Sequence, residues 1–484
     1  MRRLSYSFDS RWSALIVLCT GMLMIVLDNT VVNVALSSIQ HDLGFTNAGL
    51  AWPVNAYMIA FGGTLLLAGR LGDLVGTKRI FAVGICIFTV ASLLCGLSNS
   101  QWMLVGARFV QGLGGAMASA VILAMIFTTF TGAHDRAKAL SVFSFTASAG
   151  GSVGLLVGGV LTQALNWHWI FFVNVPIGIA TYFFAKRIIP DAHGIGIQEG
   201  ADGFGASMLT LSLMLAVYAV VQVPQGESLW QIGACGAVSV ALMAMFVVRQ
   251  ARSEKPLLPL HVFRAPNVVW SNVLQVLVVT GLFAFFFLYS LYLRRVLEYD
   301  AIRTGLAFLP ITIAIGILSV GPSARLMQRF GPRVPLIAGL LLSAAGLAVF
   351  ALASPHASFA AVILPAMLLM GVGMGIAFPC VMDFAMSTAT PSDAGLISGL
   401  VNTSAEVGGA LGLAVLAAIA ATYTSSALSA GLSSSEALTA GYRLAFGICT
   451  ICLLLSAAIS AFGLQMPRTA REGCARGAVQ HARR

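Results

Sequence analysis

GRLGDLVGTKR, residues Gly69–Arg79, is a short charged stretch that separates two long apolar runs. A related stretch, ARLMQRFGPR, occupies Ala324–Arg333 between two further apolar runs. Three pairs of residues align between the two stretches at one offset of 255 positions: Arg70 with Arg325, Gly76 with Gly331, and Lys78 with Arg333. An offset that holds at three positions predicts that the chain contains one unit twice.

The glycines of two later apolar runs extend this repeat. Gly112 and Gly114 match Gly371 and Gly373 near the same offset, each pair on a surface of small residues that suits close helix packing. We therefore expect two related six-helix halves with an inserted helix pair between them. The predicted boundaries are 1–190 for the first half, 191–255 for the inserted pair, 256–466 for the second half, and 467–484 for a basic cytoplasmic tail.

The composition is that of a chain whose solvent is lipid. Of its 484 residues, 58% are hydrophobic and 9% are charged, and the mean hydropathy is +0.91. A membrane-spanning helix needs about 20 mostly apolar residues, and fourteen runs meet that requirement, which predicts an all-α membrane protein with 14 transmembrane helices. The runs are Trp12–Leu36, Gly49–Ala68, Ile80–Leu97, Trp102–Thr129, Ala139–Leu165, Trp169–Ile188, Phe204–Val223, Leu229–Val248, Val268–Leu291, Thr304–Met327, Val334–Ala353, Phe359–Val381, Leu396–Thr422 and Arg443–Leu464.

The distribution of Lys and Arg predicts the orientation. With fourteen spans both termini lie on one side, and cytoplasmic loops carry an excess of basic residues. If the termini are cytoplasmic, 22 of the 27 basic residues fall on the cytoplasmic side. The other five are Arg108, Arg443 and the cluster Arg294, Arg295 and Arg303, which is the exception because it lies in a predicted outer loop with Glu298 and Asp300. The expected location is the cell membrane.

Charge and cysteine usage exclude several function classes. The net charge of +10 is concentrated in cytoplasmic loops, where anionic lipid attracts it, so no nucleic-acid partner is implied. Seven of the eight cysteines lie in apolar runs, which argues against disulfides and a metal site. No Gly-Lys-Ser/Thr phosphate loop is present, so an ion gradient is the expected energy source. We expect no cofactor and find no sign of an obligate protein partner.

Duplicated helix bundles are typical of transporters whose substrate site lies between the repeats. Receptors, channels and membrane enzymes can also be duplicated bundles, and the polar residues inside the apolar runs help to choose among these classes.

Asp28, within LDNTVVNVAL (Leu27–Leu36), is a carboxylate inside the first apolar run. A charge at the centre of a membrane helix costs about 2.5–3.5 kcal/mol on insertion scales. Asp28 is therefore a candidate for proton exchange or for pairing with a cationic substrate. In the alternative interpretation, it only bonds to neighbours such as Asn33 or lies close to the outer surface.

Glu406, within GLVNTSAEVGGALG (Gly399–Gly412), is the acid inside the thirteenth run. Asn402 precedes it by one turn on the same helical face. We expect Glu406 to bind a proton or a substrate, with Asn402 as a supporting polar group. The alternative places Glu406 at the mouth of the bundle.

Arg108 begins the polar part of the fourth run, and Gln111 follows one turn later. Arginine does not deprotonate in proteins, so its role is electrostatic. It either pairs with a buried acid or extends to the outer headgroups, as long basic side chains near helix ends do.

The charged stretch that follows the second run suits a conformational latch between helix ends on the cytoplasmic side, and a solvated turn is the alternative. The residues of this predicted latch are Gly69, Arg70, Asp73, Gly76, Lys78 and Arg79.

These motifs resemble the major facilitator superfamily, and specifically its fourteen-helix drug:proton antiporter branch. The resemblance covers almost the whole chain. LDNTVVNVAL is similar to the first-helix signature of that branch, GRLGDLVGTKR to the superfamily loop signature, and RFVQGLGGA (Arg108–Ala116) to the fourth-helix signature. Three further stretches are similar to the branch: NWHWIFFVNVPIG (Asn166–Gly178), PLLPLHVFRAPN (Pro256–Asn267) and GLISGLVNTSAEVGGALG (Gly395–Gly412).

The resemblance implies roles for three residues. It places protonation or drug recognition on Asp28 and Glu406, and proton coupling on Arg108. One departure is found in the fifth run, where the branch has a Gly-Pro-x-x-Gly-Gly motif. Here GLLVGG retains Gly154, Gly158 and Gly159 but has Leu155 in place of the proline, which puts the rigid kink and the sealing of the exporter in doubt.

The predicted function is proton-coupled export of small amphipathic, often cationic drugs or antibiotics across the membrane. Substrate, protons and the lipid bilayer are the expected partners. Export of one dedicated metabolite or self-made antibiotic, and proton-coupled import of a nutrient, are the alternatives within transport. A membrane sensor that moves no solute is the alternative from another class.

Overall fold

The structure is a computed structural model that describes residues 8–47, 49–130, 133–191, 202–223, 228–253, 256, 263–355, 357–386 and 394–464. Within these residues the regular elements are helices, and no strand occurs. The helices are α1 (Phe8–Leu43), η1 (Gly49–Ala51), α2 (Trp52–Val75), α3 (Thr77–Gly96), α4 (Gln101–Thr129), α5 (Ala133–Ala164), α6 (Trp169–Phe172), α7 (Asn174–Ile188), α8 (Gly203–Gln222), α9 (Leu229–Arg252), α10 (Pro266–Arg295), α11 (Ala301–Val320), α12 (Pro322–Phe330), α13 (Arg333–Ala351), η5 (Phe359–Ile363), α14 (Leu364–Met386), α15 (Ala394–Ser429) and α16 (Ser434–Phe462).

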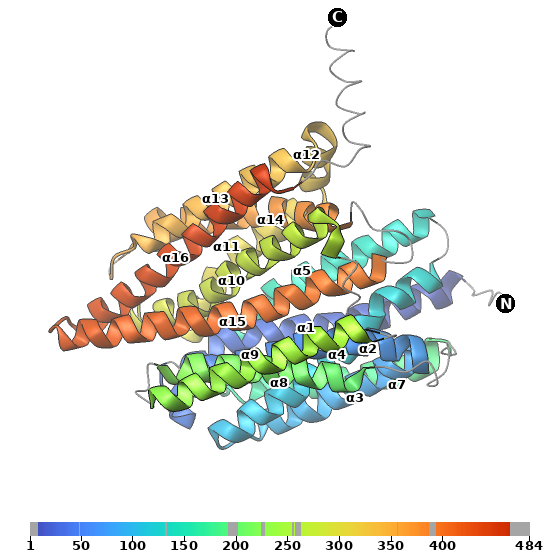
Figure 1. Cartoon of the computed structure of the whole chain (residues 1–484), viewed down its shortest axis with the longest axis horizontal. Helices are drawn as coiled ribbons and strands as arrows, with labels where there is room; N and C mark the ends of the chain where they lie inside the picture. Colours follow the sequence, from blue (N-terminus) through green and yellow to red (C-terminus); the bar gives the residue numbers. More distant parts are fainter. Residues whose placement is uncertain are drawn as a thin grey trace, which may run out of the picture.

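The predicted membrane spans are confirmed as helices, except that the predicted tenth run, Thr304–Met327, extends too far, because α11 ends at Val320 and Gly321 separates it from α12. Thirteen helical segments of the described chain are long and apolar enough to cross a membrane, and a shorter apolar segment, Val153–Ala164, forms the end of α5. Helices α6 and α7 together make one crossing. The chain is therefore an all-α protein of fourteen membrane helices. In Figure 1 the helices run along one common direction, and α1 begins at the end of the bundle where α16 finishes.

The two aligned turns of the repeat share a backbone conformation. Gly76, between α2 and α3, has φ 112°, and Gly331, between α12 and α13, has φ 72°. A side chain is strained at positive φ, whereas glycine adopts it freely. The same tight turn therefore joins two helix ends at corresponding places in the two repeats.

The paired glycines of α4 and α14 also occupy equivalent places. A Cβ at Gly112 would meet the Tyr57 carbonyl oxygen on α2, and one at Gly114 would lie 2.8 Å from the Gly84 carbonyl oxygen on α3. In the second repeat, a Cβ at Gly371 would lie 2.8 Å from Ala314 on α11, and one at Gly373 would meet Gly339 on α13. In each repeat the fourth helix thus approaches the second and third through glycine.

Contacts between the two repeats follow the same symmetry. Helix α2 packs along α15, and α5 packs along α11, so that the second helix of each repeat lies against the fifth helix of the other. Helix α1 also contacts α10 of the other repeat, as well as α4 of its own repeat. The domain boundaries at 190 and 255 stay predictions, and the predicted tail at 467–484 lies outside the described residues.

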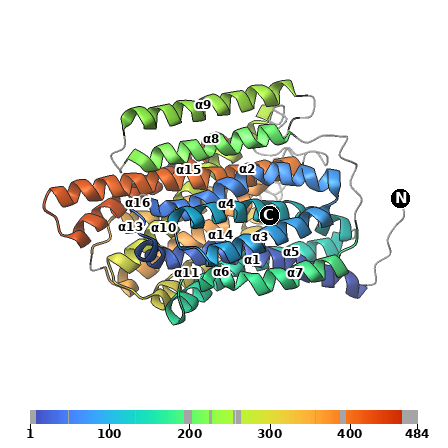
Figure 2. The same cartoon turned by 90° about the horizontal axis from the view of Figure 1, so that it is seen from below.

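Helices α8 and α9 form a hairpin at one edge of the bundle (Figure 2). Helix α8 packs on α2 and α15, and α9 packs on α8. Only 11% of the most apolar part of α9 is buried, so its apolar surface faces the lipid. Ser212 and Ser239 each donate to the backbone carbonyl of the other at 2.8 Å, which fixes the two helices at mid-length.

Candidate substrate and proton site

Asp28 lies at the centre of the first repeat with no exposed surface. Its Oδ2 accepts a hydrogen bond from Arg108 Nη1 at 2.5 Å, and its Oδ1 accepts bonds from Gln111 Nε2 and Asn174 Nδ2 at 2.8 Å each. Because both carboxylate oxygens are bonded, Asp28 is a fully satisfied buried anion in this conformation.

Arg108 is as deeply buried as Asp28. It lies two turns inside α4, has no exposed surface, and forms the ion pair with Asp28. Its Nε donates to the Pro53 carbonyl oxygen at 2.9 Å, and its guanidinium lies 4.4 Å from the centre of the Tyr57 ring. The interpretation that this side chain extends to the outer headgroups is therefore wrong, because its charge is held inside the bundle by a carboxylate, a carbonyl and an aromatic face.

Neutral groups orient the ion pair. Ser92 Oγ on α3 accepts from Gln111 Nε2 at 2.9 Å and from Asn174 Nδ2 at 3.1 Å. Gln111 Oε1 accepts from Arg108 Nη1 at 2.7 Å. Side chains from α1, α3, α4 and α7 thus make one hydrogen-bonded network, which we call the Asp28 cluster: Asp28, Ser92, Arg108, Gln111 and Asn174.

Sequence reasoning identified Asp28, Arg108 and Gln111 of this cluster and missed Ser92, Asn174 and the neighbouring Tyr57. Asn174 did carry a signal, because it is a polar residue in the apolar part of the quoted stretch NWHWIFFVNVPIG. Ser92 carried none, since serine is common in membrane helices.

Glu406 on α15 has a different environment from Asp28. Its Oε2 is buried and has no hydrogen-bond partner among the described residues. A Cβ at Gly62 on α2 would lie 2.7 Å from the Glu406 Cβ, so this glycine allows α15 to approach α2 at the site. Glu406 is half-buried and therefore places one unsatisfied carboxylate oxygen at a seam between the two repeats.

Tyr57 connects the surroundings of the two acids. Its ring packs on the Arg108 guanidinium, and its side chain lies within electrostatic range of both Asp28 and Glu406. The Tyr57 hydroxyl and Arg108 Nη2 are buried without a hydrogen-bond partner in the described part of the chain. The region between the acids thus contains polar atoms that the surrounding residues leave unsatisfied, which is the chemistry of a site that receives polar ligands.

Asn33 and Asn402 are not part of this network. Asn33 donates only long bonds, of 3.5 and 3.4 Å, to carbonyl oxygens of its own helix, and Asn402 is an exposed side chain one turn from Glu406. Asn29, Thr30 and Asn33 are not among the hydrogen-bond partners found for Asp28, whose bonds go to other helices.

The predicted latch contacts the end of α7. Lys78 Nζ donates to the Lys186 carbonyl oxygen at 2.9 Å and lies 3.2 Å from Asp191 Oδ1. Asp73 and Arg79 are exposed, whereas Arg70 is half-buried, and Gly69 has open space around it. The contact found here lies within the first repeat, between the α2–α3 turn and the last turn of α7.

The glycines of the predicted antiporter motif lie at two helix contacts. A Cβ at Gly154 or Gly158 would meet α1 at Thr30 or Val31, and a Cβ at Gly159 would lie 2.6 Å from the Ala301 carbonyl oxygen on α11. Leu155 is buried, and its carbonyl oxygen approaches Gly305 on α11. Helix α5 is one continuous element at this motif.

Three residues at the outer end of α10 bond to the first repeat. Ser290 Oγ donates to the Asn33 carbonyl oxygen. Arg294 donates to the Val34 carbonyl oxygen at 3.0 Å and to Ser38 Oγ at 3.3 Å. Arg295 Nη1 donates to Asn47 Oδ1 at 2.8 Å. We call the residues Ser290, Arg294 and Arg295 with these partners the outer seal.

The outer seal explains two of the three residues that form the exception in the charge pattern, Arg294 and Arg295. Arg294 and Arg295 lie on the outer side, but both are half-buried and bonded to the other repeat. Their guanidinium groups are used in packing between the repeats.

Comparisons with known proteins agree with this architecture. The family model described as the Major Facilitator Superfamily matches residues 18–413. The puromycin resistance protein of Streptomyces alboniger is 36% identical, over 93% of this chain and 90% of that protein. The cephamycin export protein of Amycolatopsis lactamdurans is 35% identical, over 85% of this chain and 86% of that protein. The tetracenomycin C resistance and export protein of Streptomyces glaucescens is 32% identical, over 85% of this chain and 76% of that protein.

Solved structures agree at the level of the fold. The POT family transporter PepTSo superimposes with a TM-score of 0.67 at 16% identity, over 94% of this chain and 99% of that chain.

Proposed function

The chain belongs to the major facilitator superfamily, and on that premise we propose that it is a multi-pass exporter of the cell membrane that exchanges amphipathic, often cationic compounds for protons. The relatives named for resistance or export support the outward direction and antibiotics as substrates. The many apolar helices support the location.

The observation that carries the proposal is the contrast between the two membrane acids. Asp28 is neutralised by Arg108 inside the first repeat, whereas Glu406 has a buried oxygen without a partner at the seam with the second repeat. A carboxylate with a buried, unpaired oxygen is costly unless it takes up a proton or a cation. Glu406 is therefore the primary site of competition between the proton and a cationic substrate.

Competition between a proton and a cation for Glu406 leads to exchange of the two across the membrane. A cation from the cytoplasm or the inner leaflet binds while Glu406 is ionised, and a proton from outside takes its place when the site opens outward. Exchange of one monovalent cation for one proton at a single carboxylate moves no net charge across the membrane, so the pH gradient drives the cycle. Outward opening requires the outer seal to separate.

Asp28 acts through Arg108 in this proposal. A proton on Asp28 would remove the charge that Arg108 faces, so that the guanidinium would turn toward other acceptors and alter the potential around Tyr57 and Glu406. The Asp28 cluster thus couples the protonation state of the first repeat to the substrate site.

A second candidate is export of one dedicated antibiotic by the same exchange. It is favoured by the three relatives reported above, whose names each refer to a single compound. A substrate panel separates the candidates, because a dedicated exporter moves one chemical series whereas a multidrug exporter moves unrelated amphipathic cations.

The test is transport in proteoliposomes with an imposed pH gradient, in which ethidium movement and internal pH are followed together. We expect wild type to exchange dye and protons, and Glu406→Gln to lose both. Glu298→Gln, which neutralises an exposed acid of the outer loop, is the matched control and retains exchange. Ethidium movement without a matching proton flux contradicts the coupling, and movement of neither by wild type contradicts multidrug exchange.

A further inference from the structure

Asn55 is a buried polar residue in the first turn of α2 whose side chain lacks a partner. It has no exposed surface, and its amide nitrogen and amide oxygen both have no hydrogen-bond partner among the described residues. Because the side chain has no exposed surface, no space that could hold a water molecule adjoins it. Asn55 is therefore an unsatisfied polar group in this conformation.

The position of Asn55 on α2 places it against α15. An α-helix has about 3.6 residues per turn, so Asn55, Met58 and Gly62 share one face. A Cβ at Gly62 would lie 2.7 Å from the Glu406 Cβ. A Cβ at Gly409 would meet the Met58 methyl group. This face of α2 therefore lies along α15, and Asn55 lies one turn beyond Met58 toward the outer end of the helix.

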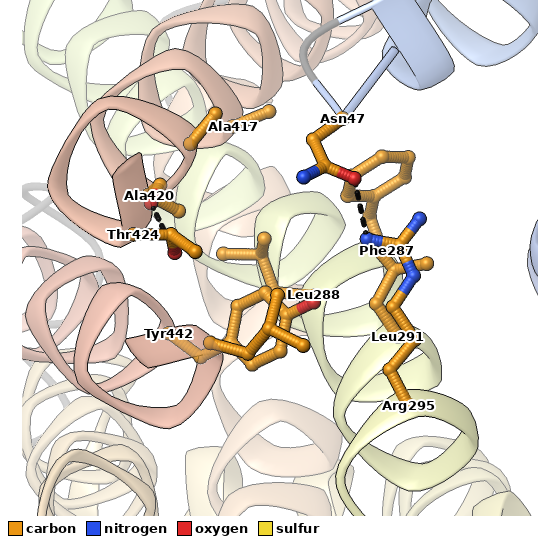
Figure 3. A pocket seen from close by; sticks show the side chains of 11 residues that line it. Asn47, Phe287, Leu288, Leu291, Arg295, Ala417, Ala420, Thr424 and Tyr442 are labelled. Atoms are coloured by element: carbon orange, nitrogen blue, oxygen red, sulfur yellow. Dashed lines mark hydrogen bonds between the residues drawn. The ribbon is translucent and has the colours of Figure 1, made fainter. Parts of the chain in front are cut away.

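The outer end of this α2–α15 seam is closed. Ala417 on α15 and Asn47, which precedes α2, line one small cavity together with Arg295 of the outer seal (Figure 3). Arg295 Nη1 donates to Asn47 Oδ1 at 2.8 Å. Asn55 thus lies in the seam between Glu406 and the outer seal.

Helix α15 offers no polar side chain at the level of Asn55. Its residues 410–421 read ALGLAVLAAIAA, so the stretch that follows Gly409 contains only apolar residues and glycine. A buried amide without a partner loses its hydrogen bonds to water and gains none in return, whereas a leucine of the same branched shape would not carry this cost. Asn55 therefore destabilises the closed seam.

We propose that Asn55 lies on the exit path and favours outward opening. When the outer half of the α2–α15 seam separates, water reaches the amide and satisfies both of its polar atoms. The cost that the amide carries in the closed seam is thereby relieved, which biases the equilibrium toward the outward-open state. Asn55 is a positioning residue that acts on this equilibrium and holds neither the proton nor the substrate.

This inference rests on outward opening in the proposed exchange, but its test needs neither a substrate nor a pH gradient. The native cysteines of the whole protein are replaced, and Asn33→Cys introduces one reporter on α1, where the Asn33 carbonyl oxygen accepts from Ser290 of the outer seal. Labelling of this reporter by a membrane-impermeant maleimide is timed in right-side-out vesicles.

We expect Asn55→Leu to slow labelling at least several-fold, because leucine relieves the cost of the closed seam. Asn55→Val also removes both polar atoms, is smaller than leucine, and should slow labelling as well. Asn55→Asp retains polar atoms at this position and should label at least as fast as wild type. Thermal unfolding of the same samples checks that each variant is folded.

Met58→Leu is the matched control. It changes a buried apolar side chain on the same face of α2 with little change in volume, and it should label at the wild-type rate. If Asn55 served only for packing, a misfit at this position would loosen the seam and speed labelling. Labelling of Asn55→Leu and Asn55→Val at or above the wild-type rate overturns the proposal. Neither reading depends on ethidium transport, so the exchange and the role of Asn55 can fail separately.

Discussion

Arg108 Nη1 and Asp28 Oδ2 lie 2.5 Å apart in an ion pair between α4 and α1, and neither side chain is exposed. The pair is the electrostatic centre of the first repeat. Both partners are further bonded to Gln111, so the two charges and the amide form a closed set of bonds.

Removal of one partner should destabilise the protein more than removal of both. Asp28→Asn leaves a buried guanidinium without its counter-charge, and breaking a buried pair in this way costs about 3–5 kcal/mol. Asp28→Asn combined with Arg108→Gln leaves only neutral amides, and we expect it to recover more than half of the lost stability. Transport should remain absent in both variants. Thermal unfolding and ethidium transport are the measurements, and a double variant no more stable than Asp28→Asn contradicts the pairing argument.

A matched pair of glycines on α4 tests the packing of the repeat. Gly112→Ala would press a methyl group against the Tyr57 carbonyl oxygen and Ala60 on α2, whereas Gly106 on the same helix has open space around it. We expect Gly112→Ala to cost about 1–3 kcal/mol, as overpacking does. Gly106→Ala should be neutral or stabilising by up to about 1 kcal/mol, because alanine is the better helix former. The measurement is thermal unfolding of the two variants under the same conditions. Equal stabilities would show that α4 does not need glycine at position 112.

Much of the fold and part of the site could be predicted from the sequence. Apolar runs locate membrane helices because each helix must bury its own backbone in lipid. Asp28 and Arg108 were visible because a charge in such a run is expensive. Ser92 and Asn174 were not visible in the sequence, since a single neutral polar side chain costs little free energy in a membrane helix. Their role follows only from the way four helices bring them together around Asp28. Arg294 was noticed as an exception to the charge pattern, but the seal that explains it depends on how α10 meets α1.

The base of the α8–α9 hairpin should depend on pH. Asp202 precedes α8, and burial by itself raises the pKa of its carboxyl. Hydrogen bonds from the Gly205 backbone N–H, Arg249 and Gln250, together with the Arg249 charge, outweigh burial and hold the pKa below its usual value of 3.8. A lowered pKa in the folded state means that the stabilisation is present above 3.8 and is lost as the pH falls through the folded value.

Asp202→Asn removes the pH-dependent contribution that the Asp202 carboxylate makes to stability. We expect wild type to lose stability relative to this variant as the pH is lowered below about 4, whereas at pH 7 the variant is the less stable of the two. Hydrogen exchange of α8 and α9 measures the effect where it arises. A stability difference that does not change between pH 7 and pH 3 would show that the Asp202 charge does not hold the hairpin.

The outer seal should set the balance between inward and outward access. Arg294→Ala removes both of its bonds to α1, to the Val34 carbonyl oxygen and to Ser38 Oγ. Hydrogen bonds that involve a charged group contribute about 1.5–3 kcal/mol each, and a bias of 1.4 kcal/mol changes a two-state ratio about tenfold. We expect the outward-open population to rise at least tenfold. To measure this population, the native cysteines are replaced and a single cysteine is placed at position 33 by Asn33→Cys. The rate at which a membrane-impermeant maleimide labels this cysteine reports outward access.

Two further variants separate the seal from a general effect of charge. Arg294→Lys retains a donor and should restore part of the closed population, since lysine can reach one of the two acceptors but does not have the forked geometry of arginine. Arg303→Ala removes a neighbouring exposed guanidinium, whose side chain is 72% exposed and pairs with Asp300, and should leave labelling unchanged. If all three variants label at the same rate, the bonds of Arg294 do not hold the outer side closed, and Ser290 or the α5–α11 seam must do so.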